Sequence, residues 1–481
     1  MIAITALAGW GADWTGLAPG TLPVISVCTF VSVICTTLFF WPHRIAIAFL
    51  GVAVLIGSRA MTLHGMLRAT ELDIIFFLIG MMVIVGALKD LGFLTWVIQS
   101  ILNKKRMTGL SFTFILCILS ALLSGLLGEV SSIVIVLALV FQVCDTLKVR
   151  TSPFVLIAVL STNIGSAATM LGNPVGIFIG NKAGLSFNQF LTGAFPIAAA
   201  SLAATLLIML IWYRKDIRQL AARMEEHRQS QCGLAPLFRI PHKRGVFVLM
   251  ATVCIIAFHH QLENIFGLTG IENKNAFLII TPLVIAAFLM LSRPERAHHD
   301  IDRNVEWHTL LFFMLLFAIA GGLREQGVTQ NMADKLVSYI QGVPSIMVPF
   351  VLMISSIGSA FMDNIVFVAA FTPVIQSLLE HSADYAVFWW ALLFGACFGG
   401  NITAVGSTAN IIALGMLEKR GDQHIGFFEW LKIGLVVSVV TGLIAWAGLT
   451  WLPVQQAAPP PAAAPQAMTS LPAPLPPGSS L

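Results

Sequence analysis

Two acidic residues lie in the middle of apolar segments of this chain, where a charge is costly. Glu129 is in SGLLGEVSSIVIV (residues 124–136), and Asp363 is in GSAFMDNIVFVAAFTPVI (residues 358–375). A charged residue at the centre of a membrane helix costs about 2.5 kcal/mol or more, so a carboxylate kept there indicates a functional role. Such a carboxylate can coordinate Na⁺ or hold a proton. The alternative interpretation is that each one lies in a water-exposed turn.

Two stretches rich in glycine and asparagine also lie inside long apolar segments. They are STNIGSAATMLGNPVG (residues 161–176) and GACFGGNITAVGSTAN (residues 395–410). Glycine, Pro174 and small hydroxyl residues in the middle of a span predict an interrupted helix, whose freed backbone groups must face protein or a cavity. Broken helices at matching places in two halves point to the binding site of a transporter. Close helix packing through small residues is the alternative, but it does not require the asparagines.

The elements that position these residues must be membrane helices. Of the 481 residues, 57% are hydrophobic and 10% are charged, and the mean hydropathy is +0.87. This composition excludes a soluble globular protein. Apolar segments long enough to cross about 30 Å of hydrocarbon recur along the chain, and each must satisfy its own backbone as a helix. The sequence therefore predicts an all-α polytopic membrane protein.

The chain contains an internal repeat. Residues 71–92 align with residues 306–327 at an offset of 235, and the same offset carries residues 124–130 onto 359–365. Glu129 then aligns with Asn364, so each half carries one carboxylate, displaced by one position. The predicted domains are an N-terminal segment (1–21), repeat 1 (22–213), a basic linker (214–244), repeat 2 (245–453) and a disordered Pro/Ala-rich tail (454–481).

Each repeat is predicted to cross the membrane five times and to contain one re-entrant hairpin whose arms are too short to span. The hairpins are residues 110–145 and 344–380, and the broken helices are residues 152–180 and 386–416. An odd number of crossings inverts the second copy relative to the first, which gives about ten transmembrane helices in all. The predicted crossings are residues 22–41, 44–58, 72–89, 152–180, 190–213, 245–264, 276–291, 307–324, 386–416 and 427–452.

The distribution of basic residues predicts the orientation. If the linker 214–244 is cytoplasmic, 21 of the 27 Lys and Arg residues lie on the cytoplasmic side and six outside. This bias follows the positive-inside rule and places both termini outside. The connection at residues 59–71 is the exception, because Arg59 and Arg68 lie on the predicted outer side.

The motifs resemble a known family. GSAFMDNIVFVAAFTPVI with WWALLFGACFGGNITAVGSTANIIALGMLEKRG, and STNIGSAATMLGNPVGIFIGNKAGLSFNQFL, are similar to the two halves of the ion transporter superfamily. The similar branch holds arsenite permeases, NhaD-type Na⁺/H⁺ antiporters and the melanosomal P protein, which share a citrate transporter-like domain. The resemblance covers residues 20–453. It implies an elevator-type transporter, usually a homodimer, with a mobile domain of hairpins and broken helices.

The resemblance also implies a substrate- or ion-binding site. Relatives commonly carry Asp-Asn at both hairpin tips, whereas this chain has Gly128-Glu129 at the first. The predicted site residues are Glu129, Asp363, Asn364, Asn163, Thr169, Gly172, Asn173, Asn401, Thr403 and Asn410.

We therefore predict a secondary active transporter in a bacterial inner membrane that moves an inorganic ion or a small oxyacid with H⁺ or Na⁺ coupling. Na⁺/H⁺ antiport or arsenite-type efflux is favoured. The predicted spans contain no lysine or arginine, which disfavours a di- or tricarboxylate symporter, although helix N-termini can bind anions. An ion channel is the alternative of another class.

The sequence does not indicate an enzyme or a nucleic-acid-binding protein. The seven cysteines have no metal or disulfide spacing, and there is no Walker A motif. The histidines at 259–260, 298–299 and 308 lie at predicted span ends, where solvated histidines are common. The expected partners are the lipid bilayer, the substrate and a second copy of the chain. No cofactor is expected beyond H⁺, or Na⁺ bound at the predicted site.

Overall fold

The computed structural model describes residues 21–102, 107–229, 242–258, 262, 276–340, 344–381, 386–421 and 424–451, in which every regular element is a helix. The predicted tail, and all of the N-terminal segment except Thr21, lie outside the described residues. The helices of repeat 1 are α2 (Thr21–Phe39), η1 (Trp41–His43), α3 (Arg44–Gly57), α4 (Leu63–Ala69), α5 (Leu72–Asp90), α6 (Phe93–Leu102), α7 (Gly109–Leu127), α8 (Glu129–Leu147), α9 (Ser152–Ser166), α10 (Pro174–Ala183), α11 (Phe187–Gln189), η2 (Phe190–Ala194) and α12 (Phe195–Trp212). The linker and repeat 2 contain α13 (Arg214–Gln229), α14 (Lys243–Ala257), α16 (Ala276–Ser292), α17 (Pro294–Asn304), α18 (Trp307–Glu325), α19 (Val328–Ile340), α20 (Pro344–Phe361), α21 (Asn364–His381), α22 (Val387–Gly399), α23 (Thr408–Glu418) and α24 (Phe427–Trp451).

Six of the described helices are long and apolar enough to cross a membrane. They are α5, α7, α8, the continuous segment Phe187–Trp212, α18 and α24. The other apolar helices, including α2, α3, α9 and α22, are shorter in their apolar part. Large apolar side chains such as Ile211, Phe247 and Phe288 are exposed on the helix surfaces, as expected of surfaces that face lipid. The chain is an integral, multi-pass membrane protein.

The first hairpin is longer than the sequence suggests. Its arms, α7 and α8, have 19 residues each and meet the length and composition of a membrane span. At 1.5 Å per residue each arm is about 28 Å long, close to the thickness of the hydrocarbon core. The prediction that its arms are too short to span was therefore wrong. The reason is that Gly128 alone makes the turn, with φ of +88°, so few residues are lost from the arms.

The linker contains a helix that was not predicted from the sequence. α13 begins at Arg214 and packs against α7 and α8. Ile217, Leu220 and Met224 are buried at a spacing of three and four residues, whereas most of the other side chains are exposed. This is the pattern of an amphipathic surface helix, and the many charges of the linker hid it. The short helices α4, α6, α17 and α19 were also missed.

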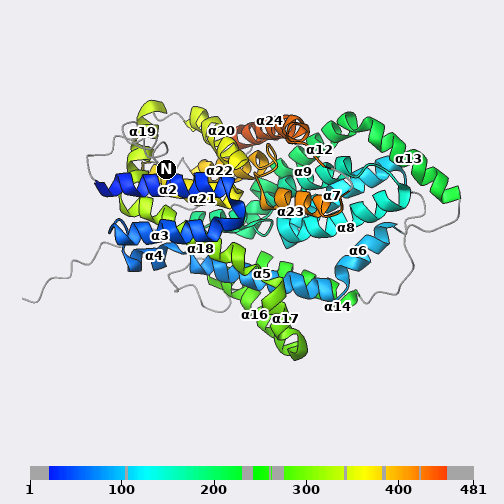
Figure 1. Cartoon of the computed structure of the whole chain (residues 1–481), viewed down its shortest axis with the longest axis horizontal. Helices are drawn as coiled ribbons and strands as arrows, with labels where there is room; N and C mark the ends of the chain where they lie inside the picture. The colour runs from blue at the N-terminus through cyan, green and yellow to red at the C-terminus, as the bar shows by residue number, and fades with distance from the viewer. Residues whose placement is uncertain are drawn as a thin grey trace, which may run out of the picture.

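The main helix contacts occur in pairs that an offset of about 235 exchanges. α3 packs on α18 and α16 packs on α5, while α7 packs on α9 and α20 packs on α22. α12 and α24, which correspond to each other, pack together. In Figure 1, α5, α16 and α17 lie along the lower edge, and α12, α13 and α24 lie along the upper edge.

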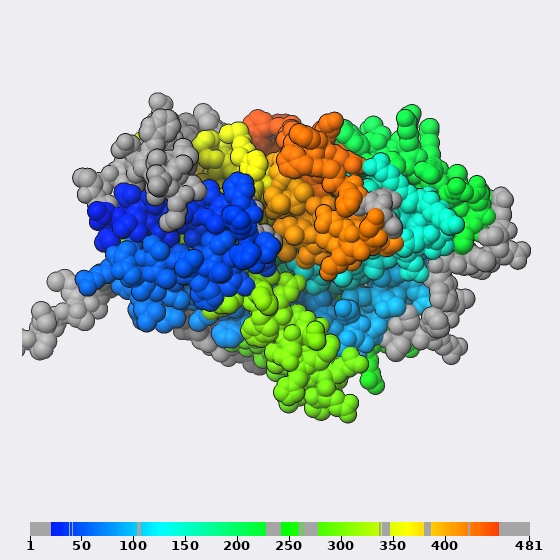
Figure 2. Space-filling view, in the orientation of Figure 1, coloured from blue at the N-terminus to red at the C-terminus, as the bar shows by residue number. Residues whose placement is uncertain are grey.

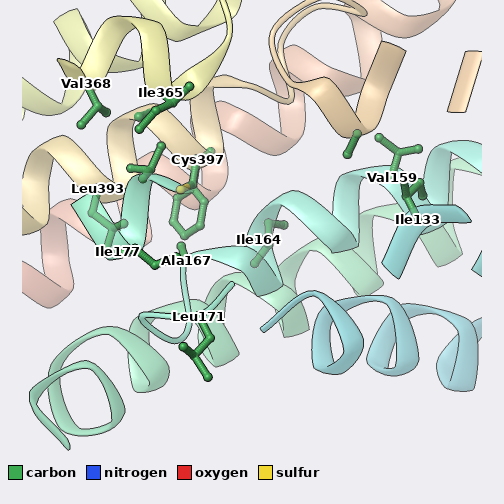
Figure 3. Packing of buried hydrophobic residues seen from close by; sticks show 14 of the residues in the cluster. Ile133, Val159, Ile164, Ala167, Leu171, Ile177, Ile365, Val368, Leu393 and Cys397 are labelled. Atoms are coloured by element: carbon green, nitrogen blue, oxygen red, sulfur yellow. The ribbon is translucent and has the colours of Figure 1, made fainter. Parts of the chain in front are cut away.

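The core of the molecule is formed by helices that are buried on all sides. Every residue of α9 is buried, as is every residue of α22 from Phe388 to its end. Figure 3 shows side chains from both repeats meeting there, among them Ile164, Leu171, Leu393 and Cys397. In the space-filling view, the segment around residues 400–440 fills the middle of the visible face (Figure 2).

Candidate functional site

Both segments that the sequence predicts as broken helices are interrupted. α9 ends at Ser166 and α10 begins at Pro174, while α22 ends at Gly399 and α23 begins at Thr408. The first break turns back so tightly that Gly172 has no room for a side chain, because a Cβ there would lie 2.1 Å from the carbonyl oxygen of Ser166. The backbone groups freed by the breaks are buried in protein, so side chains must satisfy them.

A threonine ties each break to the hairpin of its own repeat. The hydroxyl of Thr169 donates to the carbonyl of Gly125 in α7, and the hydroxyl of Thr403 donates to the carbonyl of Ala360 in α20. Each hydroxyl also accepts the backbone N–H two residues later, at 3.2 and 3.3 Å. The two threonines are related by the repeat, and both fasten a break rather than point into open space.

The half-helices that follow the breaks are capped by their own first side chains. The Oδ1 atom of Asn173 accepts the N–H of Gly176 at 2.8 Å, and the Oγ atom of Ser407 accepts the N–H of Ala409 at 3.2 Å. Such caps satisfy backbone donors that the first turn of a helix leaves without a partner. The amide nitrogen of Asn173 also donates to the Oγ atom of Ser166 at 2.9 Å.

Asn163 joins the two repeats. Its Nδ2 donates to the Oδ1 atoms of Asn401 and Asn410 at 2.8 and 2.9 Å, and its Oδ1 accepts from Ser407 at 3.1 Å. The Nδ2 of Asn410 donates in turn to the carbonyls of Gly400 and of Thr403, at 2.8 and 2.9 Å. All the amides of this cluster are fully buried. Their hydrogen bonds are used to brace the breaks, which gives these predicted site residues a structural role.

Glu129 is the first residue of α8 and lies at the tip of the first hairpin. It is 4% exposed, and its Oε2 has no hydrogen-bond partner among the described residues. The side chain of Asn173 lies against it, and the carboxylate of Asp363 is close enough to interact with its charge. The structure thus brings the two carboxylates together beside the breaks. A buried carboxylate oxygen without a partner is costly when the group is ionised.

Asp363 and Asn364 form the tip of the second hairpin. One oxygen of Asp363 accepts from the hydroxyl of Thr408, and the other accepts the N–H of Ile365 at 3.2 Å. The hydrogen-bonding pattern turns the Nδ2 of Asn364 toward the carbonyl of Gly406, to which it donates at 2.7 Å. Asn364 therefore binds the second break, while Asp363 faces a cavity.

That cavity has a volume of about 260 Å³, and Arg44 lies in its wall. Asp363, Thr408, Glu306 and Thr309 also line it. The charge of Arg44 interacts with those of Asp363 and Glu306. The prediction of a site without a basic residue was wrong, because Arg44 is the first residue of α3 and reaches inward from the end of a span. Its position directly before an apolar run was the only signal in the sequence.

The histidines do not provide a separate site. Residues 259–260 lie outside the described residues. Potential ligand atoms of His299, Asp90 and Asp300 lie within 4.8 Å of one another on α17 and the end of α5. Arg296 already forms an ion pair with Asp90 at 3.0 Å, so a surface cluster of ion pairs explains this grouping.

The fold and the paired breaks agree with comparisons to known proteins. A family model described as "Citrate transporter" matches residues 30–395, well over half of the 481 residues. This chain belongs to the citrate transporter family. As a member of that family it is a membrane transporter and not an enzyme, and the predicted place in the ion transporter superfamily is confirmed.

The citrate transporter family member has relatives in bacteria and mammals. It is 29% identical over 446 residues to an uncharacterized transporter of Mycobacterium tuberculosis, covering 90% of this chain and 98% of the relative. It is 32% identical over 390 residues to a 46 kDa membrane protein of Mycobacterium leprae, covering 79% and 86%. The P protein of Mus musculus is 24% identical over 463 residues, which are 82% of this chain and 55% of the P protein.

A solved structure supports the fold. The YdaH transporter of Alcanivorax borkumensis matches 78% of this chain and 84% of its own with a TM-score of 0.51 and 14% identity. At this level of identity the match shows the architecture alone.

Proposed function

We propose that this protein is an elevator-type secondary active transporter that couples the movement of a small ion to H⁺ or Na⁺ taken up at Glu129 and Asp363. The favoured cargo is an inorganic ion or a small oxyacid, by Na⁺/H⁺ antiport or arsenite-type efflux. The proposal includes a homodimer, two inverted repeats and both termini outside, as the sequence predicts.

The buried carboxylate of Glu129 carries this proposal. Its Oε2 has no hydrogen-bond partner among the described residues, and Asp363 adds a second negative charge nearby. Two buried carboxylates are stable together only when a proton or a cation compensates their charge. A site that must be loaded before it is buried is the requirement for coupling a driving ion to alternating access.

The arrangement of the helices supports an elevator mechanism. α10 and α21 contain or adjoin the breaks, and they contact α5 and α18, which belong to the other group of packed helices. The cavity at Asp363 lies between α3 and α18 on one side and α23 on the other. Movement of the broken helices along α5 and α18 would carry the carboxylates past this boundary.

A di- or tricarboxylate is the second candidate cargo, and Arg44 favours it. A guanidinium binds carboxylates through two parallel hydrogen bonds, and Arg44 lines the same cavity as Asp363 and Thr408. The description of the family as citrate transporters points to the same class. The neutral amides and hydroxyls near the breaks are equally suited to an oxyacid, so transport must decide between the two.

Transport in proteoliposomes tests the proposal. Na⁺, Li⁺, arsenite and citrate are offered one at a time under an imposed pH gradient. We expect gradient-driven flux of one cargo, and we expect Glu129→Gln and Asp363→Asn each to reduce it at least tenfold, because neither amide can carry a proton. If citrate is the cargo, Arg44→Gln should also abolish its flux.

Glu226→Gln is the matched control. Glu226 lies on the surface of α13 in an ion pair with Arg223, and such a pair contributes little to stability. The control should transport like the parent protein. Full gradient-driven flux in both carboxylate variants would show that the coupling ion binds elsewhere, and flux that never saturates would indicate a channel.

A further inference from the structure

A second cavity, larger than the one at Asp363, lies where α4 and the start of α5 meet the end of α10. It has a volume of about 360 Å³ and is also lined by α18 and α21. It contains neither Glu129 nor Asp363. The cavity at Asp363 and this one share no lining residue. It is therefore a separate feature of the molecule.

Three basic side chains converge on this second cavity. Arg68 comes from α4, Lys182 from α10 and Arg324 from α18. All three are among the six basic residues that the sequence places on the outer side, where the positive-inside rule disfavours them. Residues from three separate connections thus meet at one place. The exception to the charge rule has a structural reason, because these charges line a single cavity.

The acidic residues of the cavity leave the two arginines available. Glu71 forms an ion pair with Lys182 at 2.5 Å, and Glu325 accepts from the backbone N–H of Thr62 at 3.4 Å. Burial raises the pKa of Glu71, and Lys182 opposes that shift, so the pair contributes no net negative charge. Arg68 and Arg324 make no hydrogen bond or ion pair with the described residues. Both are exposed, so a solute reaches them from bulk water.

A buried hydroxyl on α21 adds a polar group to the same cavity. Thr372 is 2% exposed, and its Oγ1 has no hydrogen-bond partner among the described residues. It lines the cavity together with Arg68 and Arg324. A buried hydroxyl without a partner costs free energy unless a ligand or water satisfies it. Thr372 is thus an independent indication that this cavity receives a polar ligand.

We propose that this cavity is an anion-binding site for a small oxyanion with two or three negative charges, such as a polycarboxylate or phosphate. Arg68 and Arg324 bind the charged oxygens, and Thr372 donates to one of them. Guanidinium groups suit this role because they hold carboxylate or phosphate oxygens in a fixed geometry. A volume of about 360 Å³ is within the range of pockets that hold small molecules. Because α10 and α21 form one side and α4 and α18 another, a bound anion would bridge the two groups of helices.

Equilibrium binding to the purified full-length protein tests this site without requiring transport. The melting temperature is measured with citrate, with phosphate, and with acetate or chloride at the same ionic strength. We expect citrate or phosphate to raise the melting temperature, and acetate and chloride to have no comparable effect. The anion with the larger shift identifies the class of ligand. In Arg68→Gln/Arg324→Gln we expect the affinity to fall at least tenfold.

Three further variants distinguish this cavity from the rest of the molecule. Arg59→Gln removes a basic residue of the same predicted side that does not line the cavity, and it should bind the anion normally. Thr372→Val keeps every charge and should still weaken binding, which covers the case in which the double variant does not fold. If Arg44→Gln abolishes the stabilisation and the double variant does not, the anion binds beside Asp363 and this inference is wrong. It is equally wrong if no multivalent anion stabilises the protein.

Discussion

At the scale of single residues, Gly128 determines where the first buried carboxylate lies. Its φ and ψ are +88° and 152°, a conformation that is essentially restricted to glycine. There is open space around it, since an added Cβ would meet nothing within 4 Å. The constraint is therefore in the backbone and not in the packing. It explains why the acidic residue follows the turn and begins α8.

Restoring the Asp-Asn pair expected from the resemblance should destabilise the tip. We expect Gly128→Asp/Glu129→Asn to lose about 1–3 kcal/mol of stability, because residue 128 would hold a side chain in a strained conformation. Thermal unfolding in detergent measures the loss. Glu129→Asn alone is the control and should unfold near the temperature of the parent protein. Equal stability of the two variants would mean that the turn adopts another conformation without cost.

The sequence revealed the carboxylates but not their surroundings. Glu129 and Asp363 could be predicted because a charge inside an apolar run has few structural explanations. Arg44 could not, since a basic residue at the end of a span usually faces water. The bonds of Asn163 could not either, because they join residues more than 230 positions apart in the chain. Such contacts depend on how the helices pack.

At the scale of helices, two glycines set how closely the central helices approach their neighbours. A Cβ at Gly165 in α9 would lie 2.2 Å from the backbone of Ala121 in α7. A Cβ at Gly399 in α22 would lie 2.4 Å from the backbone of Ser356 in α20. In both cases the contact is with backbone, which cannot turn aside as a side chain can. The same close packing thus occurs in each repeat.

Alanine at either glycine should force the helices apart. We expect Gly165→Ala and Gly399→Ala each to cost on the order of 1–3 kcal/mol, as for other overpacked sites, and to reduce transport by displacing the breaks. Gly442→Ala in α24 is the matched control, because a Cβ there meets nothing within 4 Å. The control should be at least as stable as the parent, since alanine favours a helix. Thermal unfolding of the three variants provides the comparison, and an equal loss in all of them would exclude close packing as the cause.

The breaks were the most predictable elements and the helix lengths the least. Gly172, Asn173 and Pro174 together indicate an interruption, because proline and a capping asparagine start a helix where another must have ended. The arms of the first hairpin were underestimated because a turn of one glycine cannot be distinguished in sequence from a longer loop. The helix α13 was missed because its apolar residues are few among many charges.

At the scale of the whole molecule, the ion pairs group the connections by side. Each of the pairs between different helices or their connections joins residues that the sequence places on the same side of the membrane. The pairs are Arg150–Glu429, Arg420–Asp145 and Arg296–Asp90 on the predicted cytoplasmic side, and Lys182–Glu71 on the predicted outer side. This grouping supports the proposed layout of inverted repeats.

Labelling from one side of the membrane tests that layout. We expect a membrane-impermeant maleimide to modify His64→Cys on α4 in intact cells and Arg223→Cys on α13 only in inverted vesicles. Both positions are exposed. A background with Cys232→Ser removes the cysteine of the linker. Labelling of both variants from the same side would contradict the layout, and so would the reverse order.

The hydrogen bonds of Asn163 have a consequence for how the protein is made. Both acceptors of its amide lie in the second repeat, and the nearer one is 238 residues further along the chain. At about 5–20 residues per second, a ribosome needs roughly 10–50 s to synthesise that stretch. During this time α9 is inserted with a polar group that its final partners cannot yet satisfy. The first repeat must therefore wait in the membrane, with water, lipid headgroups or an assembly factor near Asn163, until the second repeat arrives.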